Sequence, residues 1–188
     1  MAWRRLLITL GIIAPILALL AFGFTRDAHY ITSPLLATPA APFNVTLFDG
    51  KKIALENLRG KAVFLNFWAS WCDPCRAEAK DLEAAWQKVK DKNMFFLGVA
   101  LQDSDQNSKE FLKEFNVSYA NGRDETGKIA VDYGTWGIPE SFFIDPQGRI
   151  TYKHVGAIRA ALVLTKLEEA AKGIPSAQEG KADYQSVR

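Results

Sequence analysis

The hydrophobic residues of this chain form one long run near its start and several shorter runs further along. The first run covers residues 6–24, LLITLGIIAPILALLAFGF, and its 19 residues include no charge. As a helix rising about 1.5 Å per residue it would span roughly 28 Å, close to the thickness of the hydrocarbon core of a bilayer. A core helix of a soluble protein is excluded because the run is apolar on every face. The pattern therefore predicts one transmembrane helix.

Two arginines, Arg4 and Arg5, precede this run. The positive-inside rule places them in the cytoplasm and the rest of the chain on the outer side. A cleaved signal peptide is the alternative, but its apolar region is usually about 7 to 15 residues long. Here the run is longer and no clear A-x-A cleavage site follows it. We therefore expect residues 1–27 to remain as a signal anchor.

Two of the shorter runs have the length of strands. They are residues 62–69, AVFLNFWA, and 94–101, MFFLGVAL. Their near-continuous apolar character is typical of central strands covered on both faces. Residues 73–92 lie between them and repeat apolar positions at helical spacing, which predicts a βαβ unit. A second helix is expected at residues 104–115, where Ser104 can cap the N-terminus.

A short hairpin is predicted before this unit and a longer one after it. Their strands are, in chain order, residues 43–48, 52–55, 140–144 and 150–155. Asp49-Gly50 joins the first pair, and the sequence DPQG at residues 145–148 joins the second, and both favour tight turns. A helix is expected at residues 159–171. This order of elements predicts an α/β fold in which helices cover both faces of a mixed sheet.

The segments on either side of the predicted domain are less regular. Residues 28–41 are rich in Pro, Ala and Thr and are interpreted as a linker between the membrane and the domain. Residues 173–188 show little periodicity and are expected to be a disordered tail. A single domain at residues 42–172 lies between them.

Composition excludes two broad classes of protein. With 48% hydrophobic and 12% aromatic residues, the chain is not a disordered polymer. Of its 23 basic and 21 acidic residues, three basic and one acidic fall within residues 1–27, so the remainder carries 20 of each sign. A nucleic-acid-binding domain needs a concentrated excess of Lys and Arg, which this neutral remainder lacks.

The candidate chemistry is concentrated in Trp71-Cys72-Asp73-Pro74-Cys75, which contains both cysteines of the chain. Two cysteines are too few for a disulfide scaffold, but these lie where a buried strand passes into a helix. The free N–H groups and the positive dipole of a helix N-terminus favour a thiolate. Cys72 is therefore the predicted nucleophile, and Cys75 is the predicted, more buried resolving cysteine of a redox-active disulfide. Pro74 falls in the first turn, where its missing N–H costs little.

Other interpretations of the cysteine pair are weaker. A static disulfide that closes about four residues would add only roughly 2 kcal/mol in the chain-entropy model. A closed zinc site needs two more ligands than one C-x-x-C supplies. Copper(I) suits thiolates, although the chain has only two Met residues to accompany them. Reversible thiol exchange is favoured, and we expect no metal and no cofactor.

Residues 64–78, FLNFWASWCDPCRAE, resemble the active-site segment of membrane-anchored thioredoxin-like proteins of the bacterial envelope. This family includes the ResA, TlpA and CcmG (DsbE) proteins of cytochrome c maturation. Residues 39–50, 98–105 and 133–156 resemble further family segments, and the likeness covers about residues 38–172. The resemblance implies a thioredoxin-like fold with a mixed central sheet flanked by helices, an N-terminal β-hairpin and a βα insertion.

The same resemblance makes Ile138-Pro139 the cis-proline loop that faces the cysteines. A cis X-Pro bond is a minority form, and here it would aim the Ile138 backbone at an extended substrate peptide. By resemblance, Glu140 lies near the cysteine pair as a proton acceptor during exchange. The alternative for Glu140 is an ordinary solvated carboxylate.

Three further positions bear on the expected chemistry. Asp73 would oppose a negative charge on Cys72 and make the couple more reducing, unless it is simply a solvated acid. Asn66 stands where thioredoxins carry a buried Asp, so the proton has to leave by another route. Trp71 is expected at the rim of the site.

The resemblance implies a thiol:disulfide oxidoreductase held in the cytoplasmic membrane by a single helix, with its catalytic domain on the periplasmic side. It is expected to reduce protein disulfides in cytochrome c maturation, with apocytochrome c as the substrate. A membrane thiol donor of the CcdA or DsbD kind is the expected partner, and nucleic acid is not expected. A disulfide-forming oxidase, a copper-delivery protein and a non-enzymatic assembly module remain as alternatives.

Overall fold

The computed structural model describes residues 2–24 and 36–176, which belong to two separate compact units. In the first unit, α1 (Ala2–Phe24) is a helix that includes Pro15. Its segment Trp3–Ala21 has a mean hydropathy of 1.9 and is long and apolar enough to cross a membrane. The predicted helix is thus present. Parts of the predicted anchor, linker and tail, residues 25–35 and 177–188, lie outside the described residues.

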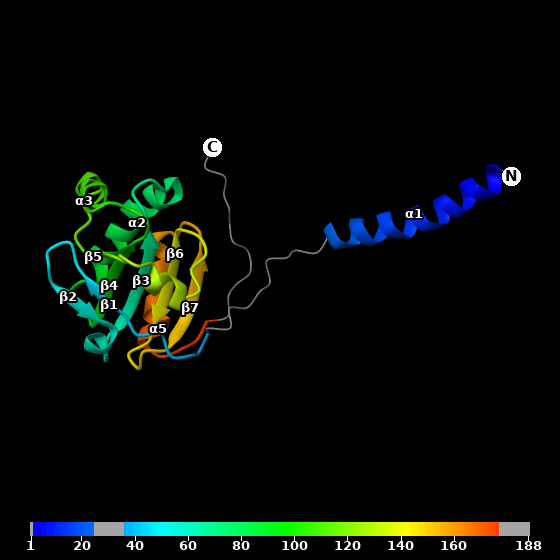
Figure 1. Cartoon of the computed structure of the whole chain (residues 1–188). Helices are drawn as coiled ribbons and strands as arrows, with labels where there is room; N and C mark the ends of the chain where they lie inside the picture. The colour runs from blue at the N-terminus through cyan, green and yellow to red at the C-terminus, as the bar shows by residue number, and fades with distance from the viewer. Residues whose placement is uncertain (1, 25–35, 177–188) are drawn as a thin grey trace. The chain divides into compact units, whose positions relative to one another are not determined.

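Within residues 36–176, five strands form one mixed sheet in the order β5-β4-β3-β6-β7 (Figure 1). The strands are β3 (Ala62–Trp68), β4 (Met94–Ala100), β5 (Ala120–Arg123), β6 (Glu140–Ile144) and β7 (Ile150–Val155). β3, β4 and β5 are parallel, β6 is antiparallel to β3, and β7 is antiparallel to β6. β3 lies at the centre, and all seven of its residues are buried.

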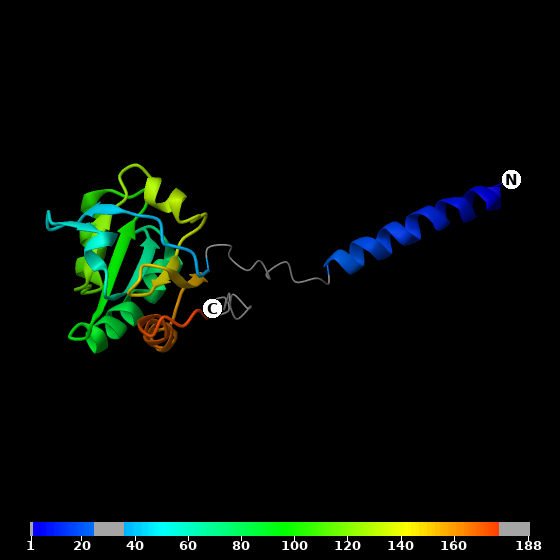
Figure 2. The ribbon, with the colours of Figure 1, turned by 90° about the horizontal axis from the view of Figure 1, so that it is seen from below.

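Different elements cover the two faces of this sheet, which Figure 2 shows from below. α2 (Asp73–Val89) and α5 (Ala160–Ala171) pack against the face that carries Ala62 and Phe64. The opposite face, which carries Val63, Leu65 and Phe67, is covered by shorter elements. These are β1 (Asn44–Thr46), β2 (Lys52–Ala54), the 3-10 helix η1 (Leu55–Leu58) and α4 (Lys128–Asp132). α3 (Asp105–Glu114) packs through Phe111 beside Trp68 and the cysteines.

The predicted strands and helices of the domain are present within a few residues of their expected bounds, whereas the position of β5 was not predicted. Its sequence, Ala-Asn-Gly-Arg, is short and has none of the apolar character of a buried strand. A Cβ on Gly122 would lie 2.5 Å from the Thr46 carbonyl oxygen. The missing side chain lets the β1–β2 hairpin approach this edge strand, where Leu47 forms a β-bridge with Gly122.

The described end of the predicted linker is bonded to the sheet. Ala37 N–H donates to the Ile150 carbonyl at 2.8 Å, and Ile150 N–H donates back to the Thr38 carbonyl at 3.0 Å. Ala40 N–H donates to the Gly148 carbonyl at 2.9 Å, and Ala40 is buried. Residues 37–40 are therefore part of the folded domain, beside the start of β7.

Candidate active site

Cys72 and Cys75 form a disulfide where β3 leads into α2. Their sulfur atoms are 2.14 Å apart and their Cα atoms 5.2 Å apart. Cys72 is the N-cap of α2, and its sulfur accepts a hydrogen bond from the Cys75 backbone N–H at 3.2 Å. The exposed fraction is 5% for Cys72 and 2% for Cys75, so Cys75 is the more buried residue, as expected. The same helix N-terminus would stabilise a thiolate on Cys72 after reduction.

The segment that precedes β6 faces Cys72. The Ile138–Pro139 peptide bond is cis, which confirms the expectation from the family resemblance. The Ile138 carbonyl oxygen lies 3.7 Å from Cys72 Sγ. The Pro139 carbonyl accepts a hydrogen bond from Gly156 N–H at 2.9 Å, which ties this segment to the end of β7. A backbone carbonyl beside a sulfur is an arrangement to which an extended polypeptide can bind.

The turn before Cys72 is held by the loop that follows β4. The Asp103 carboxylate accepts hydrogen bonds from Ser70 N–H at 2.7 Å and from the Ser70 hydroxyl at 3.0 Å. The Ser108 hydroxyl, on α3, donates to the same carboxylate at 3.1 Å. Trp71 Nε1–H donates to the Gln102 carbonyl at 3.1 Å. The cysteine turn is therefore fixed to the start of α3.

Arg76 bridges the first turn of α2 and α3. It donates to the Ser70 carbonyl at 3.3 Å and pairs with Glu114 at 2.5 Å. Its guanidinium lies 5.0 Å from the centre of the Phe115 ring, within the range of a cation–π contact. Arg76 thus adds a second connection between the turn and α3.

Glu78 is a candidate functional residue that the sequence interpretation missed. It is buried on α2, where Asn66 Nδ2–H donates to it at 2.9 Å and the Ile158 backbone N–H donates at 2.9 Å. Burial raises the pKa of Glu78 to about 8, and the two hydrogen bonds only partly oppose this shift. Its position three residues after Cys75 was the available signal, because that spacing places both residues on one helix face. Asn66 also donates to the Ser141 hydroxyl at 3.1 Å.

Glu140 lies on the other face of the sheet from Glu78. It pairs in register with Phe67, whose side chain belongs to the core under the hairpin and α4. Paired residues of antiparallel strands point to the same face. Glu140 is fully buried, and its Oε2 lies 2.8 Å from Lys153 Nζ. The structure therefore brings Glu78, rather than Glu140, to the α2 face that carries Cys75.

The other predicted site residues lie at the surface around the disulfide. Asp73 and Pro74 occupy the exposed first turn of α2. Trp71 is 59% exposed, as expected of a rim residue. Trp136, two residues before Ile138, is 86% exposed. Two exposed indole groups therefore neighbour the site residues in the sequence: Trp71 precedes Cys72, and Trp136 precedes the cis-proline pair.

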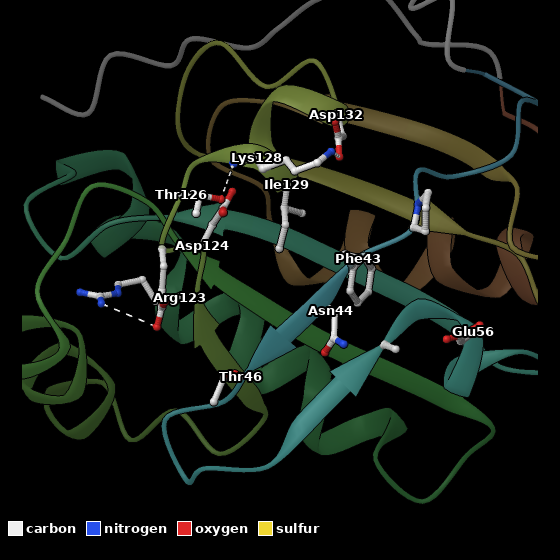
Figure 3. Close-up of a pocket in the computed structure, with 13 residues that line it drawn as sticks. Phe43, Asn44, Thr46, Glu56, Arg123, Asp124, Thr126, Lys128, Ile129 and Asp132 are labelled. Carbon is white, nitrogen blue, oxygen red and sulfur yellow. Dashed lines mark hydrogen bonds and ion pairs between the residues drawn. The ribbon is translucent and has the colours of Figure 1, made fainter.

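A hollow lies between the β1–β2 hairpin and the segment from β5 to α4 (Figure 3). It has a volume of about 520 Å³, and Phe43 and Ile129 contribute apolar side chains to it. Its lysine, Lys128, is paired with Asp132 at its edge. The residues lining it include neither cysteine. In residues 2–24 and 36–176, no group of three or more His, Cys, Asp or Glu side chains is arranged to hold a metal ion.

Comparison with known proteins gives a consistent set of relatives. The model of the AhpC/TSA family matches residues 36–153. The thiol-disulfide oxidoreductase ResA of Bacillus thuringiensis subsp. konkukian is 33% identical over 157 residues, which cover 82% of this chain and 88% of the relative. The thiol:disulfide interchange protein DsbE of Pseudomonas fluorescens biotype C is 34% identical over 138 residues, covering 72% and 75%.

A solved structure supports the same likeness. The crystal structure of a thioredoxin-family thiol:disulfide interchange protein from Chlorobium tepidum TLS matches with a TM-score of 0.65 and 29% identity. The match covers 71% of this chain and 96% of that one. The thioredoxin-like fold that the sequence resemblance implied is thereby confirmed.

Proposed function

The chain belongs to the AhpC/TSA family and is a thiol–disulfide oxidoreductase of the thioredoxin-like ResA and DsbE type, and we propose that it reduces protein disulfides outside the cytoplasmic membrane. The observation that carries this proposal is the position of the Ile138 carbonyl, 3.7 Å from Cys72 Sγ. An extended substrate bound along that backbone would bring its own disulfide to the more exposed cysteine.

The reaction is a two-step exchange that starts from the reduced pair. The Cys72 thiolate attacks one sulfur of the substrate disulfide, forms a mixed disulfide and releases the other substrate sulfur as a thiolate that takes up a proton. The Cys75 thiolate then attacks Cys72 Sγ, breaks the mixed disulfide and releases the second substrate sulfur as a thiolate, which also takes up a proton. Two electrons and two protons pass to the substrate, and the Cys72–Cys75 disulfide is left.

Glu78 is the proposed acceptor of the proton that Cys75 must lose before it attacks. It lies one helical turn after Cys75, and its pKa of about 8 lets it exchange a proton near neutral pH. Asn66, which replaces the buried Asp of thioredoxins, donates to Glu78 and so holds the carboxyl in place. This assignment replaces Glu140 by Glu78 in the proposed proton route.

The remaining features of the proposal concern location and partners. α1 would anchor the domain on the periplasmic side, since Arg4 and Arg5 favour a cytoplasmic N-terminus. The family resemblance supports apocytochrome c as the substrate. The oxidised pair must then be reduced again, so a membrane dithiol donor of the CcdA or DsbD kind is the proposed electron source.

Trapping of mixed disulfides tests this function in the full-length, membrane-bound protein. In a Cys75→Ser variant the second step is blocked, so a substrate attacked by Cys72 should stay covalently attached. The trapped proteins are then identified by mass spectrometry, with and without reducing agent. We expect a c-type apocytochrome among them, and a Cys72→Ser variant as the control should trap none.

Two outcomes would contradict different parts of the proposal. If Cys75→Ser traps no protein at all, reduction of protein disulfides is the wrong function. If proteins are trapped but none takes part in cytochrome c assembly, only the substrate assignment fails.

A further inference from the structure

A buried lysine lies behind the cis-proline loop. Lys153, on β7, is 7% exposed, and its Nζ lies 2.8 Å from Glu140 Oε2. The same nitrogen donates to the Gly134 carbonyl at 3.1 Å. It also lies 5.0 Å from the centre of the Phe142 ring. One ammonium group therefore connects a carboxylate, a backbone carbonyl and an aromatic face.

Packing alone does not account for a lysine at this position. Lys153 pairs in register with Phe142, so its side chain points to the face of the sheet that carries Phe67 and against which Tyr133 packs. Moving an ammonium group and a carboxylate out of water is costly, and apolar residues of similar volume often stabilise such a site equally well. A methionine would fill the same space. The charge is therefore expected to have a role beyond the hydrophobic core.

Gly134 and Glu140, two polar partners of Lys153, lie at the two ends of one segment. Residues 134–140 run from the end of α4 into β6 and carry the cis Ile138–Pro139 bond. Gly134, at the first end, has a positive φ of 58°. Within the segment, Trp136 and Gly137 are exposed, so packing does little to hold its middle. The position of Ile138 against Cys72 therefore depends on the bonds that hold the rest of the segment, which are the Gly156–Pro139 hydrogen bond and the bonds of Lys153 at its ends.

We infer that Lys153 is a positioning residue for substrate: it fixes the Gly134 carbonyl and the Glu140 carboxylate, and thereby holds the Ile138 backbone against Cys72. The inference rests on the proposed reduction of protein disulfides. A protein substrate needs this loop because its extended chain binds there. A small disulfide such as glutathione disulfide needs only access to Cys72. Lys153 should therefore matter for one kind of substrate much more than for the other.

The test compares two rates in one variant. For Lys153→Met we expect the ratio of kcat/KM for a protein disulfide, such as insulin, to that for glutathione disulfide to fall about tenfold, because a small displacement of a binding group has a large effect on rate. Most of the fall should come from a higher KM for insulin. The ratio is independent of the fraction of folded enzyme, so a simple loss of stability would leave it unchanged.

Two further variants control for the burial of charge. Lys166 is also a buried lysine, paired with Glu169 at 3.1 Å and 5.0 Å from the Tyr152 ring, but it lies on α5. Lys166→Met should leave the ratio as in the unmodified protein. If Lys153→Met alone folds poorly, the double variant Lys153→Met with Glu140→Gln leaves no unpaired buried charge. It should show the same low ratio, since Gly134 still lacks its donor.

The results separate this inference from the proposed function. Suppose that the unmodified protein exchanges with both disulfides. An unchanged ratio in Lys153→Met and in the double variant would then overturn the positioning role of Lys153 and leave the proposed function intact. An equal fall in Lys166→Met would also overturn it, because any buried lysine would then have the effect. Failure of the unmodified, reduced protein to exchange with any protein disulfide, that of a c-type apocytochrome included, would overturn the proposed function itself.

Discussion

Glu78 shows how the surroundings of one residue can control the pH response of the protein. Its pKa is about 8 in the folded state against a usual 4.5, because burial disfavours the carboxylate. The folded protein therefore binds more protons than the unfolded chain between these values. With respect to Glu78, the free energy of unfolding is therefore highest below about pH 4.5. It falls as the pH rises from about 4.5 to 8.

A Glu78→Gln variant should lose this dependence. Between about pH 5 and pH 8 the unmodified protein should lose roughly 3 kcal/mol of unfolding free energy through Glu78, and the variant should not. Urea denaturation of the oxidised protein at four pH values measures the difference. The matched control is Glu110→Gln on the exposed surface of α3, whose pH dependence should follow the unmodified protein. Parallel curves for Glu78→Gln and the unmodified protein would show that Glu78 titrates normally.

Trp136 should act on substrate binding and little on folding. Its side chain is 86% exposed, so Trp136→Ala should change stability by no more than about 0.5 kcal/mol. If a protein substrate covers this indole group beside the cis-proline loop, kcat/KM for insulin reduction should fall roughly tenfold. Val131→Ala, at a 75% exposed position, is the control for a general loss of apolar surface. Equal rates for all three proteins would exclude Trp136 from the binding surface.

The residues of the site differed in how far the sequence could identify them. Cys72, Cys75 and Pro139 were recognisable because their roles depend on local motifs and on the resemblance. Glu78 was missed because a glutamate near a helix start usually faces solvent, and only the packing of Ile158 and Asn66 against it makes it buried. The face of the sheet to which Glu140 points could not be assigned from the sequence, because it depends on the register of β6 against β3.

At the scale of elements, the loop after β4 should control the rigidity of the cysteine turn. Asp103 accepts two hydrogen bonds from Ser70, and an amide at this position would present N–H groups to those donors. Asp103→Asn should therefore lower the unfolding free energy by roughly 1–3 kcal/mol, measured by urea denaturation. The control is Asp105→Asn, which removes an exposed ion pair with Arg123. It should lower the unfolding free energy by less than about 1 kcal/mol. Similar losses in the two variants would argue against a specific role for Asp103.

The central elements that the sequence predicted have a clear pattern of apolar residues, and the elements that it did not predict lack one. β3 and β4 are continuous apolar runs, and α2 repeats apolar residues along the face that packs on the sheet. β5 is held instead by its place beside β4 and by the approach of the hairpin at Gly122. α4 spans only Lys128–Asp132, which is too short for a helical period to show. Both elements depend on tertiary contacts that a local pattern does not record.

At the scale of the whole molecule, the domain should begin before residue 42. Residues 37–40 form three backbone hydrogen bonds with residues 148–150, and Ala40 is buried. A soluble chain that starts at Leu36 should therefore be more stable than one that starts at Pro42, by about 2 kcal/mol. Thermal unfolding followed by circular dichroism gives this comparison. Equal melting temperatures would mean that residues 37–40 only rest on the sheet, and both chains should retain exchange with glutathione disulfide.

The hydrogen bonds of Glu78 have a consequence for how the redox chemistry of the enzyme responds to pH. Through Asn66, Ile158 and its own helix, this carboxyl joins β3, the start of α5 and the turn that carries the cysteines. Three equilibria then share one group: unfolding, proton binding and the oxidation state of the sulfurs. Coupling between equilibria is reciprocal. If oxidation of the cysteine pair shifts the pKa of Glu78, then protonation of Glu78 shifts the redox equilibrium of the pair by the same free energy. The pH around the domain would then act on the electron supply through this single side chain.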